Sequence, residues 1–194
     1  MTRGPLVADR NVEPGLEERR EFAASIGRVT ASAGVPALVR SWSRGERGDA
    51  MALVRRLGEL GVTGLLVDTA VGGVGGDTVD VVVALERLGH ACVPGPVVET
   101  VAVAPVLLGV GDDAASLAAG TALASVASAS HMPRAVDADQ CDIVLWLDED
   151  HAALAEVVAS HSSVDPARNL CDVVAGERLA VDAEKVHAAR DLGA

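Results

Sequence analysis

The order of elements between residues 49 and 109 constrains the fold of this chain more than any other feature. A periodic apolar segment begins at Asp49, and a glycine loop with the sequence GGVGG follows over residues 72–76. A second periodic segment ends near His90, and a Pro-Gly-Pro turn then leads into a third over residues 97–108. Apolar residues that recur every three or four positions indicate amphipathic helices, which glycine and proline terminate. The pattern therefore predicts three successive helices separated by a glycine loop and a proline turn.

The residues before this segment extend the helical pattern. An apolar stripe over residues 13–33 predicts one more helix, which Gly34 and Pro36 end. Residues 40–48 are polar and contain two glycines, so they are predicted to form a loop.

The second of the three central helices has a polar start and an apolar face. Asp77 or Thr78 can cap its first turn, because their side-chain oxygens accept hydrogen bonds from free backbone amides. A short further helix is predicted over residues 112–117. Four apolar side chains of the second helix are predicted to point inward: Val81, Val82, Leu85 and Leu88.

The composition changes at Gly120, after which short β-type segments replace the helical pattern. Residues 143–146 form an apolar run between acidic groups and predict a buried strand, whereas residues 152–158 fit either a strand or a short helix. Asp165 and Pro166 mark a turn. A hairpin is predicted from residues 170–174 and 178–181, joined by residues 175–177.

These segments predict an α+β chain in which an all-α region precedes a small β-rich one. The predicted parts are a loose N-terminal arm over residues 1–12, a helical domain over 13–119, a small β domain over 120–183, and the start of a helix over 184–194.

Composition and charge exclude several classes of function. The formal net charge is −12, and a surface this acidic repels nucleic-acid phosphates and anionic membranes. The sequence has neither a secretory signal nor an apolar run of the roughly 18 residues that a membrane span needs. Three widely spaced cysteines, Cys92, Cys141 and Cys171, fit free thiols in a reducing compartment. A cytoplasmic protein without nucleic-acid or membrane partners is therefore expected.

Local motifs give no complete catalytic or metal site. The glycine loop lacks the Gly-Lys-Ser/Thr ending of a phosphate-binding loop, and a flexible turn between helices is the preferred interpretation. The five histidines lack the spacing of a zinc site, so no metal is expected. Glu86 and Glu99 could line a pocket, although glutamates on helices usually face solvent. A hydrolase that uses serines near His131 is a further alternative, with the candidates Ser125, Ser128 and Ser130.

Four helical segments follow one another in a fixed order: residues 57–67, 72–76, 85–89 and 94–100. Taken together, they resemble the N-terminal helical domain of acyl-CoA dehydrogenases of the actinobacterial type, including those that act on steroid side chains. The later segments AVDAD (residues 135–139) and SVDPAR (residues 163–168) are similar to the middle β domain of that family.

This resemblance implies oxidation of an acyl-CoA thioester to the 2,3-enoyl-CoA. In the family a glutamate removes the α proton, and FAD accepts a hydride from the β carbon. The helix over residues 97–108 would supply one wall of the acyl pocket, with Glu99, Thr100 and Val103 as the candidate substrate-binding residues. Ordinary helix packing is the alternative interpretation of all three.

Two departures from the family pattern modify this expectation. The chain ends at Ala194, where the family would begin the helical domain that carries its catalytic base. The middle domain also lacks recognisable Thr-Glu…Ser and Trp-Ile-Thr segments, which pack on the flavin in the family. No catalytic residue is therefore assigned, and FAD is expected only if a partner chain completes its site.

The expected function is that of a partial or accessory acyl-CoA dehydrogenase subunit. Its partner would be a full-length subunit of the acyl-CoA dehydrogenase type or another copy of this chain. The alternative is a non-catalytic interaction module or an inactive remnant. In that case apolar surface is expected to be uncovered on the helix over residues 97–108 and on the β unit.

Overall fold

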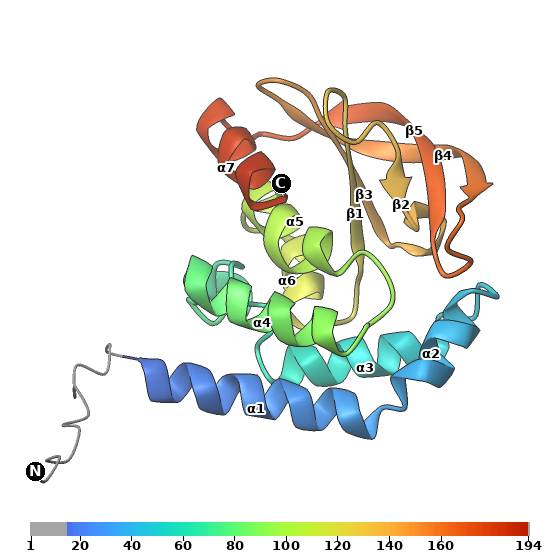
Figure 1. Ribbon diagram of the computed structural model, residues 1–194. Helices are drawn as coiled ribbons and strands as arrows, with labels where there is room; N and C mark the ends of the chain where they lie inside the picture. The colour runs from blue at the N-terminus through green and yellow to red at the C-terminus, as the bar shows by residue number, and fades with distance from the viewer. Residues whose placement is uncertain (1–14, 194) are drawn as a thin grey trace, which may run out of the picture.

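The computed structural model describes residues 15–193 (Figure 1), so the arm predicted over residues 1–12 lies outside the described part of the chain. An N-terminal group of helices is followed by a five-stranded sheet and a last helix, which confirms the predicted α+β class. The helical elements before the sheet are α1 (Leu16–Ser32), α2 (Val35–Trp42), α3 (Gly48–Glu59), η1 (Thr69–Val71), α4 (Thr78–His90), η2 (Glu99–Val103), α5 (Ala104–Leu108) and α6 (Asp112–Ala118).

The first four α-helices enclose an aliphatic core. Ile26 of α1 and Leu88 of α4 are almost completely buried in it, and Leu53 and Leu57 enter it from α3. An ion pair at the surface also joins α1 to α4, because Arg19 contacts Asp77 at 2.6 Å and Asp80 at 2.9 Å. The helix predicted over residues 13–33 is confirmed as α1.

The loop predicted over residues 40–48 is wrong at its start, because its first residues end the helix α2. Gly34 ends α1 as predicted, but Pro36 occupies the first turn of α2 rather than a terminating position. Proline is tolerated there because the first amides of a helix have no intrahelical partner. Trp42, at the end of α2, is only 1% exposed.

Helix α4 begins with a capping box. The Asp77 side chain accepts a hydrogen bond from the backbone amide of Asp80, and the Asp80 side chain accepts one from the amide of Asp77. Asp77 is therefore the cap, one of the two residues predicted. The predicted inward face is wrong at Val82, which is 60% exposed; Ala84 is buried instead.

The glycine loop is packed tightly against the segment that precedes it. The amide of Val74 donates to the carbonyl of Gly64 at 3.0 Å, and the amide of Gly76 donates to the carbonyl of Leu65 at 2.9 Å. The apolar run over residues 62–67 thus lies beneath the loop. These contacts make the loop a close-packed turn rather than a flexible one.

The helix predicted over residues 97–108 is confirmed, but its middle residues form a turn wider than that of an α-helix. Residues 99–103 form one π-helical segment, η2, in which the amide of Ala104 donates to the carbonyl of Glu99, five residues back. Pro105 follows directly and has no amide hydrogen for the carbonyl four residues before it. The proline therefore accounts for the wide turn, a geometry often found at functional sites.

The sheet has the strand order β1-β3-β4-β5-β2. β1 pairs parallel to β3, and the other neighbouring strands are antiparallel. Figure 1 shows the sheet on one side of the molecule, with α5 and α6 between it and α4. The elements of this half are β1 (Ala124–Ser128), β2 (Ala135–Val136), η3 (Ala138–Gln140), β3 (Ile143–Leu147), β4 (Ala152–Ser162), β5 (Asn169–Arg178) and α7 (Ala183–Gly193).

The predicted hairpin within residues 170–181 is wrong. These residues belong mainly to one continuous strand, β5, which pairs with β4. The hairpin turn lies instead between β4 and β5, at the Asp165-Pro166 signal. The strand predicted over residues 143–146 is confirmed as β3, and the ambiguous segment that starts at residue 152 is strand β4.

A second core joins the helices to the sheet. Val103 and Leu107 pack with Val126 of β1, Leu145 of β3 and Val186 of α7. The predicted exposure of the helix over residues 97–108 is therefore wrong for most of its apolar residues, because α7 and β1 cover them. The division of the chain at residue 119, between α6 and β1, stays a prediction.

The apolar surface expected on the β unit is present. Val158 on β4, Val174 on β5 and Val164 in the turn between them are 62%, 55% and 104% exposed. Within residues 15–193, no single helix combines the length and hydropathy of a membrane span; only α1 and α2 together, bent by 66° at their junction, satisfy that test.

Candidate functional site

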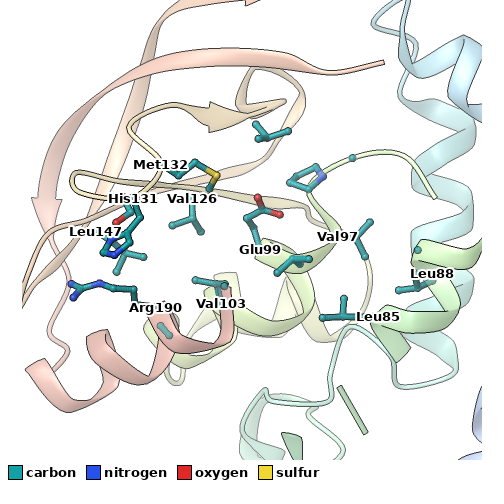
Figure 2. A pocket seen from close by; sticks show the side chains of 18 of the residues that line it. Leu85, Leu88, Val97, Glu99, Val103, Val126, His131, Met132, Leu147 and Arg190 are labelled. Carbon is teal, nitrogen blue, oxygen red and sulfur yellow. The ribbon is translucent and has the colours of Figure 1, made fainter. Parts of the chain in front are cut away.

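A cavity of about 680 Å³ lies between the helical half of the chain and the sheet. Its walls come from the end of α4, from η2, from strands β1 and β3, and from α7. Figure 2 shows that its two ends differ in chemistry: Leu85, Leu88 and Val97 form an apolar end, and His131 and Arg190 lie at the other. Glu99 lies between the two ends. This volume is in the range of about 300–1,000 Å³ that is typical of small-molecule sites.

The widened helix η2 directs the three predicted pocket residues in two directions. Glu99 and Val103, four positions apart, both line the cavity. Thr100 does not line it, because its hydroxyl turns toward β1, where it donates to the carbonyl of Ala124 and accepts from the amide of the same residue, both at 3.1 Å. Thr100 therefore fixes the wall to the sheet, and its assignment as a substrate-binding residue stays a prediction.

The carboxyl group of Glu99 is largely withdrawn from water. Burial raises its pKa above the ordinary value of 4.5, the buried carboxylate of Asp137 adds to that effect, and the Arg168 guanidinium opposes it. The neutral form is therefore favoured more strongly in the folded chain than in the unfolded chain. Such a group in a cavity is a candidate for contact with a ligand.

Glu99→Gln is expected to stabilise the chain at neutral pH but not in acid. Because the folded-state pKa is raised, the wild-type side chain contributes stability below about pH 4.5 that is lost as the pH rises through the folded pKa. Glutamine does not titrate, so the free energy of unfolding of the Glu99→Gln variant exceeds that of the wild type by more as the pH rises. Urea denaturation of both proteins between pH 4 and pH 8 measures the difference; an identical pH dependence of the two free energies of unfolding would contradict the account.

Several cavity residues were not predicted to line the acyl pocket. They come from β1, from the loop after it, from the turn before β5 and from α7. Ser128 and His131 had been considered only for a hydrolase, and Arg168 lies in the segment that resembles the family's middle domain. The main additional residues are Ser128, His131, Met132, Arg168 and Arg190.

The alternative catalytic patterns have only partial support in the structure. Ser130 and His131 are hydrogen-bonded at 2.7 Å, but both are exposed, and no carboxylate among residues 15–193 hydrogen-bonds to His131. Ser125 instead donates to the carbonyl of Val136 at 2.7 Å. In the described part of the chain, no three histidine, cysteine, aspartate or glutamate side chains converge as a metal site would require.

The cavity fits one small ligand group but not a complete flavin site. FAD and an acyl-CoA are both larger than the drug-sized molecules that such volumes enclose. Among the described residues, the cavity lining at β1 and just after it combines the aliphatic side chains of Val126 and Leu147 with Ser128, His131 and Met132. The residues present therefore do not hold a whole FAD together with a substrate.

Comparison with known proteins agrees with this geometry. The family model of the acyl-CoA dehydrogenase N-terminal domain matches residues 16–126, which is more than half of the chain. Acyl-CoA dehydrogenase IpdE2 of Mycobacterium tuberculosis is 33% identical over 85 residues, which cover 43% of this chain and 27% of that protein.

Two solved structures share the fold at low sequence identity. The acyl-CoA dehydrogenase of Bacillus anthracis complexed with FAD matches with a TM-score of 0.59 at 14% identity, over 91% of this chain and 40% of that one. The Tcur3481-Tcur3483 steroid ACAD matches with a TM-score of 0.65 at 14% identity, over 91% of this chain and 60% of that one.

The chain thus spans between about a quarter and three fifths of the length of these three relatives. The part that matches contains η2 and the first three residues of β1, two elements that form walls of the cavity. The family match, the fold and the position of the cavity lead to one conclusion: this chain belongs to the acyl-CoA dehydrogenase family.

Proposed function

We propose that this chain is a partial or accessory subunit of an acyl-CoA dehydrogenase. It supplies one half of the acyl-binding cleft, and a partner chain supplies the flavin site and the base. The substrate is an acyl-CoA thioester of fatty-acid or steroid side-chain breakdown. The observation that carries this proposal is a cavity of about 680 Å³ built on the family's helical domain, with no complete flavin site among the described residues.

The residues of this chain would bind and orient the acyl group. Leu85, Leu88 and Val97 offer an apolar surface to its hydrocarbon part, and Val103 continues that surface toward the sheet. Burial of such a chain excludes water from the reacting carbons and contributes about 0.8 kcal/mol per CH₂ group. Glu99 and Val103 line the cavity, and Thr100 holds its wall in place through the hydrogen bonds to Ala124 of β1.

The partner is a full-length subunit of the acyl-CoA dehydrogenase type or a second copy of this chain. The exposed valines of the β4–β5 hairpin, Val158, Val164 and Val174, are the candidate contact residues for this partner. A cytoplasmic location remains part of the proposal and rests on the three free cysteines.

The chain purified alone is expected to be colourless and inactive. Co-expression with a full-length acyl-CoA dehydrogenase from the same genome is expected to give a yellow complex on size-exclusion chromatography, with flavin absorbance in the same peak as both chains. The control is the full-length subunit expressed by itself. Separate elution of the two chains in every combination would contradict the proposal and favour an inactive remnant.

A further inference from the structure

Strand β1 has an open edge, and its hydrogen bonds to β3 show which residues face that edge. β1 lies at one end of the strand order, where β3 is its neighbour. The carbonyl of Leu123 accepts from the amide of Ile143 of β3 at 3.1 Å. The amide of Ala129 donates to the carbonyl of Leu147 of β3 at 2.9 Å. Because the backbone groups of successive residues point to opposite sides of a strand, the odd-numbered residues of β1 bond to β3 and the even-numbered residues face the open edge.

Two of the three even-numbered residues of β1 have partners on this edge. The amide and the carbonyl of Ala124 both bond to the hydroxyl of Thr100, at 3.1 Å each. The amide of Ser128 donates to the carbonyl of Met132 at 2.7 Å, and its carbonyl accepts from the amide of Met132 at 3.0 Å. The third residue, Val126, lies between them. Its amide and carbonyl have no hydrogen-bond partner on this edge within the described part of the chain.

The unpaired groups of Val126 are buried at the cavity. Val126 is only 2% exposed and lines the cavity, as do Ser128 and Met132, which continue the same edge. Figure 2 shows Val126 between His131 and Glu99. A buried backbone amide or carbonyl almost always has a hydrogen-bond partner, because leaving it unpaired costs free energy. The unpaired groups of Val126 therefore point to a ligand that offers one acceptor and one donor.

A secondary amide in an extended chain offers both groups. Extended peptides bind the open edges of other sheets in this way, through backbone hydrogen bonds. A carboxylate, an ester or a hydrocarbon lacks the N–H donor that the carbonyl of Val126 requires. The pantetheine arm of coenzyme A carries such an amide two carbon atoms from the sulfur of the thioester. The apolar end of the cavity, at Leu85, Leu88 and Val97, lies on the far side of Glu99 from Val126, where an acyl chain attached to that sulfur can extend.

We propose that the edge of β1 at Val126 binds the first amide of the pantetheine arm of an acyl-CoA. The amide of Val126 donates to the carbonyl of the ligand, and the carbonyl of Val126 accepts from the N–H of the ligand. This inference rests on the proposed function, because it specifies how the same cavity holds its substrate. The acyl group and this amide lie inside the cavity of about 680 Å³, and the nucleotide of coenzyme A lies outside it.

Two hexanoyl thioesters of equal length test the proposal. The thioester of N-acetylcysteamine keeps the first amide of pantetheine, whereas the thioester of 2-mercaptoethyl acetate has an ester oxygen in place of the N–H. Isothermal titration calorimetry with the full chain is expected to give a dissociation constant about tenfold lower for the amide compound. In NMR spectra, that compound is expected to move the amide proton of Val126 downfield. The amide proton of Ala129, which already donates to Leu147, is expected to stay in place.

Val126→Pro tests the protein side of the contact. It removes the amide hydrogen of this residue but none of the hydrogen bonds to β3, and proline is accepted on the open edge of a sheet. Both thioesters are expected to bind about tenfold more weakly than to the matched control, Val126→Ala, which keeps the amide. The preference for the amide compound persists, because the carbonyl at this position remains. Circular dichroism verifies folding; if Val126→Pro does not fold, the two measurements on the wild-type chain decide the proposal.

The remaining outcomes separate this inference from the proposed function. Equal affinity of the wild-type chain for the two thioesters overturns the amide site and leaves the acyl-CoA function intact. Pantetheine carries the amides without an acyl group. If pantetheine binds and shifts the amide proton of Val126 while neither thioester binds, the amide site is supported and the acyl-CoA function is contradicted. Failure of all three compounds to bind contradicts both.

Discussion

Gly73→Ala is expected to destabilise the chain by roughly 3 kcal/mol or more, a large effect for the addition of a single methyl group. A Cβ atom at this position would lie 1.7 Å from the carbonyl oxygen of Val67 and 2.4 Å from its carbonyl carbon. Both are backbone atoms, so no change of rotamer relieves the overlap. The close packing of the glycine loop on residues 62–67 then has to open.

The measurement is thermal unfolding followed by circular dichroism. For a chain of this length, 3 kcal/mol corresponds to a decrease in Tm of roughly 6–12 °C. Gly27→Ala is the control, because a Cβ there meets no atom within 4 Å and the residue lies inside α1. That change is expected to raise stability by up to about 1 kcal/mol. Equal Tm values for Gly73→Ala and the wild type would show that the loop does not pack as described.

Asp137→Ala is the second large effect, with an expected loss of roughly 3 kcal/mol or more. The carboxylate is 1% exposed and accepts two hydrogen bonds, from the indole N–H of Trp42 at 3.1 Å and from the amide of Asn169 at 2.7 Å. Asp137 also has a φ of 52°, a left-handed conformation that alanine adopts at a cost of about 1–2 kcal/mol. The mutation therefore leaves two donors unpaired and strains the backbone.

This carboxylate connects the end of α2 to the start of β5. Burial raises its pKa, and the two N–H donors oppose that shift, so the hydrogen bonds compensate the cost of a buried charge. Urea denaturation measures the effect, with Asp150→Ala as the control. The side chain of Asp150 is 73% exposed, and among residues 15–193 its side chain pairs only with the neighbouring His151, so a change within about 0.5 kcal/mol is expected. If Asp137→Ala lowers the free energy of unfolding no more than the Asp150→Ala control does, Asp137 does not stabilise the contact between α2 and β5 as described.

The helical part of the fold could be predicted because its signals are local. Periodic apolar residues and an Asp77 cap define α4 within a single stretch of sequence. The missed helix α2 shows the limit of such signals, since Pro36 can either end a helix or occupy the first turn of the next one. Strand β5 shows a second limit of local signals. Residues 175–177 have the composition of a turn, but pairing with β4 keeps them extended.

The site was harder to predict than the fold because its residues converge from distant segments. The resemblance to a family indicated Glu99, Thr100 and Val103 as residues of the pocket wall. Glu99 and Val103 line the cavity, and Thr100 joins that wall to β1. A π-helical turn changes which side chains share a face, and ordinary helical periodicity cannot show it. Ser128 and Arg190 line one cavity because α7 packs against β1 and β3, which no local pattern indicates.

The central claim is that this chain contains only one half of a catalytic cleft, and reconstitution of activity tests it most directly. The rate of acyl-CoA oxidation, with an artificial electron acceptor and added FAD, should be measured for the chain alone and during titration with its full-length partner. The account predicts no turnover by the chain alone and a rate that rises to a plateau at a fixed ratio of the two chains. Stoichiometric binding of FAD and turnover of an acyl-CoA by the isolated chain would contradict it.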